Sequence, residues 1–371
     1  MPPHRFEVLD SWRGICALMV ALLHFEAFSH LKDMPFFNDT YLFVDFFFVL
    51  SGFVIAANYQ ARLGNGFGVT KFMLLRFGRL YPLYFVMLIA FFALEITDGW
   101  SGAFVAPRKS VDTVFANLFL FQSFGIYDFL TWNTPGWSIA TEFWTCLLFA
   151  FIATWWPRKL NVILILAACV SLTLIFFKSA HGMNVTYDYG MVRCLAGFAI
   201  GVLTYAVWNR LNAFEFDERL AFVLEVMCVV FTILFVAAVW QSNYSILAPL
   251  VFAIVVLVFA AERGPVSSLL KSRGFLILGA FSYSIYMVHL LVEMLLVDAA
   301  KYADVEFGFR LITKFQREDS VVDMLGLNQW QGDIWVVVLL VTLVAISALT
   351  YRWIEVPSRN WFRQLAQTAR P

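Results

Sequence analysis

Ten long apolar runs constrain the fold of this chain more than any other feature of its sequence. Each is about 18 residues or longer, close to the length that an α-helix needs to cross the hydrocarbon core of a bilayer. A helix satisfies its own backbone hydrogen bonds in lipid. The sequence therefore predicts an all-α integral membrane protein, a bundle of about ten transmembrane helices. The predicted helices lie at residues 11–29, 41–59, 73–95, 136–156, 160–177, 190–208, 221–240, 245–261, 276–299 and 333–355.

The composition supports a membrane environment and argues against nucleic acid. Hydrophobic residues make up 61% of the chain and charged residues 14%, whereas soluble domains are about half apolar and about a quarter charged. The formal net charge is zero. A nucleic-acid-binding protein needs a basic face, so we expect the lipid bilayer as a partner and no nucleic acid.

Lysine and arginine are distributed unequally about the predicted helices. With the N-terminus inside the cell, about twice as many of the 26 basic residues lie in inner segments as in outer ones. The positive-inside rule then predicts that both termini are cytoplasmic. Two long loops, 96–135 and 301–332, are predicted outside, and residues 113–124 form a short interfacial or re-entrant helix. We expect residues 1–371 to form one transmembrane domain without a fused soluble domain.

The first predicted helix and the cysteines exclude two other interpretations. Arg13 and His24 lie in that helix, and the apolar core of a cleaved signal peptide would not carry them, so we expect the helix to be retained. All five cysteines fall inside predicted helices without the spacing of metal sites, so we expect no disulfide and no metal. They are Cys16, Cys146, Cys169, Cys194 and Cys228.

Titratable residues inside membrane helices are candidate site residues, because lipid penalises them unless they face a cavity or a partner. Arg13 and His24 are eleven positions apart, just over three helical turns, so they share one face about 16 Å apart along the axis. Arg13 lies near the predicted cytoplasmic end and His24 in the outer half. Together they outline one wall of a channel.

Two arginines mark the predicted cytoplasmic start of the third helix. Arg76 and Arg79 are three positions apart and therefore lie on one side of the helix. Arginine pairs recognise phosphate through bidentate hydrogen bonds. The alternative is that both residues only mark the interface and bind lipid headgroups.

Glu142 lies six residues into a helix that is predicted to enter from outside, at a depth of about 9 Å, while His24 is about 7.5 Å from the outer end of its own helix. The two side chains could therefore meet at one level. A His–Glu pair positions a general base. The alternative is a packing pair that is held together by a hydrogen bond or an ion pair.

Four further polar residues are candidates for an acceptor site or for a structural role. Asp45 and Arg193 lie near the outer ends of their helices, where they are predicted to form an ion pair or to serve separate interfacial roles. Tyr286 and His289 lie in the middle of the ninth predicted helix. For His289, a hydrogen bond to a neighbouring helix is the simplest interpretation.

Six segments of the chain form a recognisable series. They are LDSWRG (9–14), with His24 eleven positions after its arginine, VDFFFVLSGF (44–53), RFGRLYP (76–82), WSIATE (137–142), SYSIYMVH (282–289) and EVPSR (355–359). In this order they resemble the membrane-bound acyltransferase family 3, which includes bacterial O-acetyltransferases of O-antigen, exopolysaccharide and Nod factor, and the similarity runs along nearly the whole chain. One departure is visible: Phe143 follows Glu142, where members of the family often carry a second glutamate.

The resemblance implies that Arg13, Arg76 and Arg79 bind acyl-CoA on the cytoplasmic side, that His24 is the essential catalytic residue and that Glu142 is functional. The expected protein is a transmembrane O-acyltransferase of the bacterial inner membrane. It would move an acyl group, expected to be acetyl, from acetyl-CoA to a hydroxyl of an extracytoplasmic carbohydrate such as a polysaccharide, a glycolipid or a lipid-linked oligosaccharide. Acetyl-CoA is then a substrate, and no cofactor is expected to stay bound.

In the expected reaction, His24 takes the proton of the acceptor hydroxyl as that oxygen attacks the thioester. Glu142 would orient the imidazole or stabilise its charged form, and an acyl-histidine intermediate is the alternative route. Two other functions fit the same helices. One is a proton-coupled secondary transporter, although the sequence has no paired interrupted helices or matching halves. The other is an acyltransferase that acts on a small lipophilic acceptor.

Overall fold

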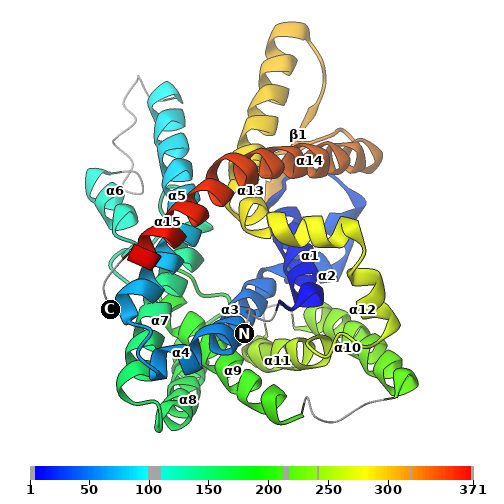
Figure 1. Ribbon diagram of the computed structural model, residues 1–371. Helices are drawn as coiled ribbons and strands as arrows, with labels where there is room; N and C mark the ends of the chain where they lie inside the picture. The colour runs from blue at the N-terminus through cyan, green and yellow to red at the C-terminus, as the bar shows by residue number, and fades with distance from the viewer. Residues whose placement is uncertain (1–4, 99–109, 212–216, 240–241, 318–319, 369–371) are drawn as a thin grey trace.

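The computed structural model describes residues 5–98, 110–211, 217–239, 242–317 and 320–368. It is an all-α integral membrane protein, as predicted, with one small hairpin (Figure 1). Within the described residues, eight helices are long and apolar enough to cross a membrane. The other two predicted spans correspond to a first helix that carries three charged residues in its first two turns, and to an apolar helix that is shorter than a full span.

The helices follow one another with short 3₁₀ or π segments between some of them. Their bounds are α1 (Glu7–His24), α2 (Pro35–Asn38), α3 (Phe43–Ile55), α4 (Ala61–Gly64), α5 (Val69–Asp98), α6 (Val111–Leu118), α7 (Gly136–Trp155), α8 (Leu160–Lys178), α9 (Gly190–Leu211), α10 (Glu218–Ala238), α11 (Ala248–Phe259), α12 (Pro265–Leu270), α13 (Arg273–Phe307), α14 (Gln329–Thr350) and α15 (Val356–Thr368). The π segments are η3 (Ala56–Gln60) and η7 (Tyr351–Glu355).

Three boundaries differ from the sequence prediction. α1 ends at His24 rather than near residue 29, because Phe25 has extended backbone angles. α5 begins at Val69, four residues early, so Arg76 and Arg79 lie two to three turns inside the helix and not at its start. The predicted outer loop 301–332 contains the end of α13 and an antiparallel hairpin, β1 (Ile312–Arg317) and β2 (Ser320–Leu325). Residues 99–109 of the other predicted outer loop lie outside the described part of the chain, and its predicted short helix corresponds to α6.

The hairpin lies beside the segment that follows α1. The backbone N–H of Leu325 donates to the carbonyl of Glu26 at 3.0 Å, and that of Phe28 donates to the carbonyl of Leu325 at 2.9 Å. These two hydrogen bonds attach β2 to the chain immediately after His24. The extended backbone at the end of α1 therefore has a partner.

Some helices lie at the centre of the bundle and others at its periphery. α3 lies at the centre, where 72% of the apolar span Thr40–Gly64 is buried, whereas only 28% is buried in α8 and in α10. Figure 1 shows these two helices at the edge of the molecule. Their exposed apolar side chains are the surface that a bilayer would cover.

Glycines allow α1 and α13 to approach closely, as small residues do in membrane proteins. A Cβ on Gly14 would lie 2.6 Å from the carbonyl carbon of Leu278, and a Cβ on Gly279 would overlap the carbonyl oxygen of Asp10. This contact fixes the two helices that carry Arg13 and His289. The helix pair therefore determines where both residues lie.

We expect Gly279→Ala to destabilise the folded protein, because the added methyl group forces α1 away from α13. Overpacking of this kind costs about 1–3 kcal/mol. Gly274→Ala on the same helix is the matched control, since its Cβ would meet open space. Thermal unfolding in detergent should show a lower Tm for the first variant alone. Equal Tm values for both variants would contradict the close packing of these helices.

Candidate active site

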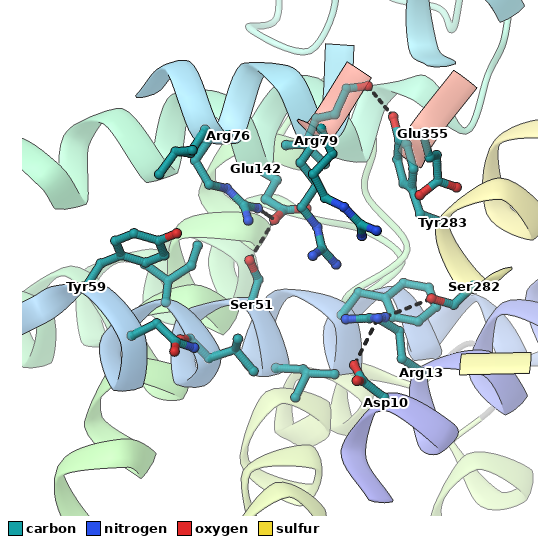
Figure 2. Close-up of a pocket in the computed structure, with 18 of the residues that line it drawn as sticks. Asp10, Arg13, Ser51, Tyr59, Arg76, Arg79, Glu142, Ser282, Tyr283 and Glu355 are labelled. Atoms are coloured by element: carbon teal, nitrogen blue, oxygen red, sulfur yellow. Dashed lines mark hydrogen bonds and ion pairs between the residues drawn. The ribbon is translucent and has the colours of Figure 1, made fainter. Parts of the chain in front are cut away.

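A cavity of about 900 Å³ opens into the helical bundle. Its lining includes Arg5, before α1, and Gln367, on α15, and the charge bias predicts both of these segments to be cytoplasmic. The lining also includes Ser138 and Tyr286 within α7 and α13. Figure 2 shows its charged lining. The cavity therefore extends from the predicted inner face toward the middle of the bundle.

Three arginines predicted to bind acyl-CoA converge on this cavity from two helices. Arg13 comes from α1, and Arg76 and Arg79 come from adjacent turns of α5 (Figure 2). Arg13 is held in place, because its Nε donates to Ser282 Oγ at 2.7 Å and its Nη2 lies 2.9 Å from Asp10 Oδ1. The structure thus brings together the three residues on which the sequence prediction of a donor site rested.

Glu142 forms an ion pair with Arg76 and accepts a hydrogen bond from Ser51 Oγ at 2.6 Å. These contacts join α7, α5 and α3 across the cavity wall. Arg76 is only 9% exposed, and its Nε atom has no hydrogen-bond partner among the described residues. The glutamate therefore neutralises and orients a buried arginine.

Arg79 differs from its two neighbours. Within the described residues, no hydrogen bond or ion pair engages its guanidinium. It faces the cavity beside Arg13 and Arg76, so three like charges lie close together in a partly buried setting. An unpaired guanidinium there is stabilised when an anion enters the cavity.

The expected contact between Glu142 and His24 is wrong. The Nδ1 atom of His24 lies 2.9 Å from the carbonyl oxygen of Val20. The ring centroids of His24 and His289 are 5.2 Å apart. Glu142 instead faces α5 and α3. The depth of a residue along its helix predicts its level in the membrane, but which neighbour it faces depends on how the helices rotate and tilt.

His24 and the cavity are separated by two side chains of α13. Tyr286 lines the cavity, and its hydroxyl lies 2.8 Å from Ser138 Oγ. The ring centroid of His289 is 5.8 Å from that of Tyr286. In space, Tyr286 and then His289 therefore lie between the deep end of the cavity and His24.

The sequence favoured a hydrogen bond from His289 to a neighbouring helix, but none is found among the described residues. Its Nδ1 lies 2.7 Å from the carbonyl oxygen of Tyr286, in its own helix. The side chain is fully buried, and its Nε2 has no partner among the described residues. Glu293, one turn further along, also has a buried oxygen without a partner there. His289 therefore places a second buried polar side chain beside His24.

The predicted Asp45–Arg193 ion pair is present. Arg193 Nε donates to one carboxylate oxygen at 3.0 Å and Nη2 to the other at 2.7 Å. The carbonyls of Val185 and Tyr41 accept from the rest of the guanidinium. Both side chains are at most 1% exposed. The pair closes on itself between α3 and α9, which supports a structural role rather than an acceptor site.

Sequence reasoning missed several residues that line the cavity. Arg62, Arg359 and Arg363 line it, and nothing in their spacing along the sequence indicates that α4 and α15 contribute to one cavity. Tyr283 and Glu355 also line the cavity, and Glu355 accepts a hydrogen bond from Ser284.

In the part of the chain that the structure describes, no group of three or more metal-ligating side chains is found.

The fold and this site define a polytopic membrane protein with an arginine-lined cavity that reaches the middle of its bundle. Comparison with protein families then places the chain: residues 6–353 match the family described as acyltransferase domain, and the chain belongs to this family.

Two relatives agree with this placement. The peptidoglycan O-acetyltransferase OatA of Listeria monocytogenes is 26% identical across 95% of this chain and 55% of its own length. Protein 2 in the picA locus of Rhizobium radiobacter is 46% identical over 88 residues, which are 24% of this chain and 44% of that protein. The chain spans about half the length of the curated relatives it matches. No solved structure matches it.

We expect Asp45→Ala to destabilise the protein by about 3–5 kcal/mol, because it leaves a buried guanidinium without a countercharge. The double variant Asp45→Ala/Arg193→Met should recover part of that loss, since both charges are then absent. Thermal unfolding in detergent measures both effects. A double variant that is less stable than the single one would show that the pair is not the main contact of Arg193.

Proposed function

We propose that this chain is a transmembrane O-acyltransferase that takes an acyl group, expected to be acetyl, from cytoplasmic acyl-CoA and delivers it to a hydroxyl of an extracytoplasmic carbohydrate. The observation that carries the proposal is the lining of the cavity. Seven arginines and three carboxylates, Asp10, Glu142 and Glu355, contribute an excess of four positive charges if all are ionised. The lining among the described residues includes no lysine.

The charge of the cavity matches that of CoA. The 3′-phosphate and the diphosphate of CoA together carry about four negative charges near neutral pH. Arginine binds such groups through paired, planar N–H donors, which lysine does not offer. An anion of this kind would also supply the partner that Arg79 lacks. The thin pantetheine arm would then extend toward Ser138 and Tyr286.

The contact of His24 with Val20 supports its role as general base. A carbonyl oxygen only accepts hydrogen bonds, so the Nδ1 of His24 carries the proton in this contact and Nε2 keeps its lone pair. The backbone carbonyl of Val20 thus fixes the tautomer of His24, which is the role that the sequence analysis expects of Glu142. We assign Glu142 instead to the positioning of Arg76 at the donor site.

The transfer step follows from this tautomer. The acceptor hydroxyl gives its proton to Nε2 of His24 while its oxygen attacks the thioester carbon. The C–S bond then breaks, and the leaving CoA thiolate takes the proton back from the imidazolium. His24 is exposed at the end of α1, so an acceptor can approach it without entering the cavity. The acyl group reaches it past Tyr286 and His289, which must move.

A carbohydrate acceptor fits the relatives. One of them is named for O-acetylation of peptidoglycan, and that polymer lies outside the cytoplasmic membrane. A position in the bacterial inner membrane, with the cavity facing inward, gives the enzyme access to both substrates. A small lipophilic acceptor or a transported solute would give a different result in the second test below.

The first test is of the donor site. Arg79→Ala should weaken CoA binding about tenfold or more, because charge-assisted hydrogen bonds to phosphate are lost. Arg352→Ala is the control, since this exposed arginine does not line the cavity. Binding to the purified protein in detergent can be followed by calorimetry. Unchanged CoA affinity in the Arg79 variant would refute the assignment of the cavity to CoA.

The second test is of sidedness. In sealed, oriented proteoliposomes, labelled acetyl-CoA on the side of the cavity mouth should acetylate envelope glycan fragments from a deletion strain that are enclosed on the other side. Free CoA should appear where the donor was added. The His24→Ala variant should bind CoA normally yet transfer nothing, because His24 does not line the cavity. Transfer only when donor and acceptor share a compartment, or solute movement without CoA release, would overturn the proposal.

A further inference from the structure

α15 forms part of the cavity wall although it lies beyond residues 6–353, where the match to the acyltransferase family ends. Arg359, Arg363, Ala366 and Gln367 line the cavity. Their spacings of four, three and one residue place all four on one face of the helix. This helix therefore adds Arg363 to the cavity from beyond both the family match and the EVPSR segment, next to Arg359 at the end of that segment.

A close contact holds that face beside the deep arginines. Phe362 packs against Gly78, where any Cβ would overlap the phenylalanine side chain, and its ring lies 5.3 Å from that of Phe77 in an edge-to-face arrangement. Gly78 lies between Arg76 and Arg79 on α5. Figure 1 shows α15 crossing α5. The docking of α15 thus places its cations next to the predicted donor site.

Near the mouth, Arg62 and Arg359 contact aromatic rings, and no acidic side chain among the described residues pairs with them. Among the described residues, Arg62, Arg359 and Arg363 form no hydrogen bond or ion pair through their guanidinium groups, and the Nε of Arg359 is buried without a partner. The guanidinium carbon of Arg62 lies 3.9 Å from the ring centroid of Phe67 and 5.1 Å from that of Tyr59. Arg62 and Arg363 are exposed. The mouth therefore offers free cations beside aromatic rings.

We propose that α15 and Arg62 bind the 3′-phosphoadenosine end of the donor, while Arg13, Arg76 and Arg79 bind its diphosphate. This inference rests on the proposed function. It follows from the order of groups in CoA, because a thioester that points toward Tyr286 places the diphosphate deeper than the 3′-phosphate. The planar side chain of Arg62, already stacked on aromatic rings, suits an adenine base.

The consequence is a choice between acyl donors. Acyl carrier proteins and CoA present the same phosphopantetheine arm, but only CoA carries a 3′-phosphoadenosine. A mouth that recognises this group selects free acyl-CoA over an acyl carrier protein. It also selects CoA over its 3′-dephospho form, which differs by a single phosphate. A comparison of the affinities for these two ligands therefore measures what the 3′-phosphate contributes to binding.

The experiment compares CoA with 3′-dephospho-CoA on the purified full-length protein in neutral detergent. The wild type should prefer CoA about tenfold. Arg363→Ala should weaken CoA binding by about the same factor and leave 3′-dephospho-CoA unchanged, so that the preference disappears. Arg363→Lys should restore only part of it. Arg352→Ala, an exposed arginine that does not line the cavity, should keep the full preference.

The outcomes separate this inference from the proposed function. If neither ligand binds the wild type, both fail. If CoA binds in an Arg79-dependent manner and Arg363→Ala keeps the full preference for CoA, the assignment of α15 is wrong and the proposed function stands. A repeat with phosphatidylglycerol tests the other source of phosphate. If the wild type loses its preference for CoA over 3′-dephospho-CoA when phosphatidylglycerol is added, the arginines at the mouth bind lipid headgroups instead. That result would also overturn the inference.

Discussion

An arginine in a membrane helix needs an anion or water, because its charge cannot be left bare in lipid. This chain meets that requirement in two ways. Arg193 is closed off, with both oxygens of Asp45 and two backbone carbonyls around it. Arg79 is open, facing a cavity without any hydrogen bond or ion pair among the described residues. The first arrangement holds helices together, and the second prepares a place for an anionic ligand. The countercharge of Arg193 is built into the fold, whereas that of Arg79 has to come from a ligand or from solvent.

The pairing of α1 with α13 supports both ends of the proposed reaction. The glycine contact that brings these helices together allows Arg13 to bond Ser282 on the cavity side and sets His24 against His289 on the other side. Donor binding and proton transfer would thus depend on the same helix pair. Since Tyr286 and His289 lie between the two ends, the proposed transfer requires these two side chains of α13 to move.

Glu142 shows both the reach and the limit of reasoning from sequence. Its burial in an apolar helix marked it as a functional residue, and its position along that helix was predicted correctly. Its partner was not. The carboxylate binds Arg76 and Ser51 rather than His24, because the rotation of α7 in the bundle turns this face of the helix toward α5 and α3. The backbone carbonyl of Val20 takes the place beside His24 that the glutamate was expected to fill.

Hydrophobicity alone determined that this chain is a helical membrane protein, since apolar runs of this length have no other stable form in lipid. Helical periodicity, together with the cost of burying charge, also determined which titratable residues to examine, and it left an Asp45–Arg193 ion pair as one of two alternatives. Only the tertiary structure decided which of them share one cavity. It placed Arg62 and Arg363, from opposite ends of the chain, at a common mouth, and it separated His24 from Glu142. Rotation and tilt of helices depend on side-chain packing between segments far apart in sequence, and no local pattern records them.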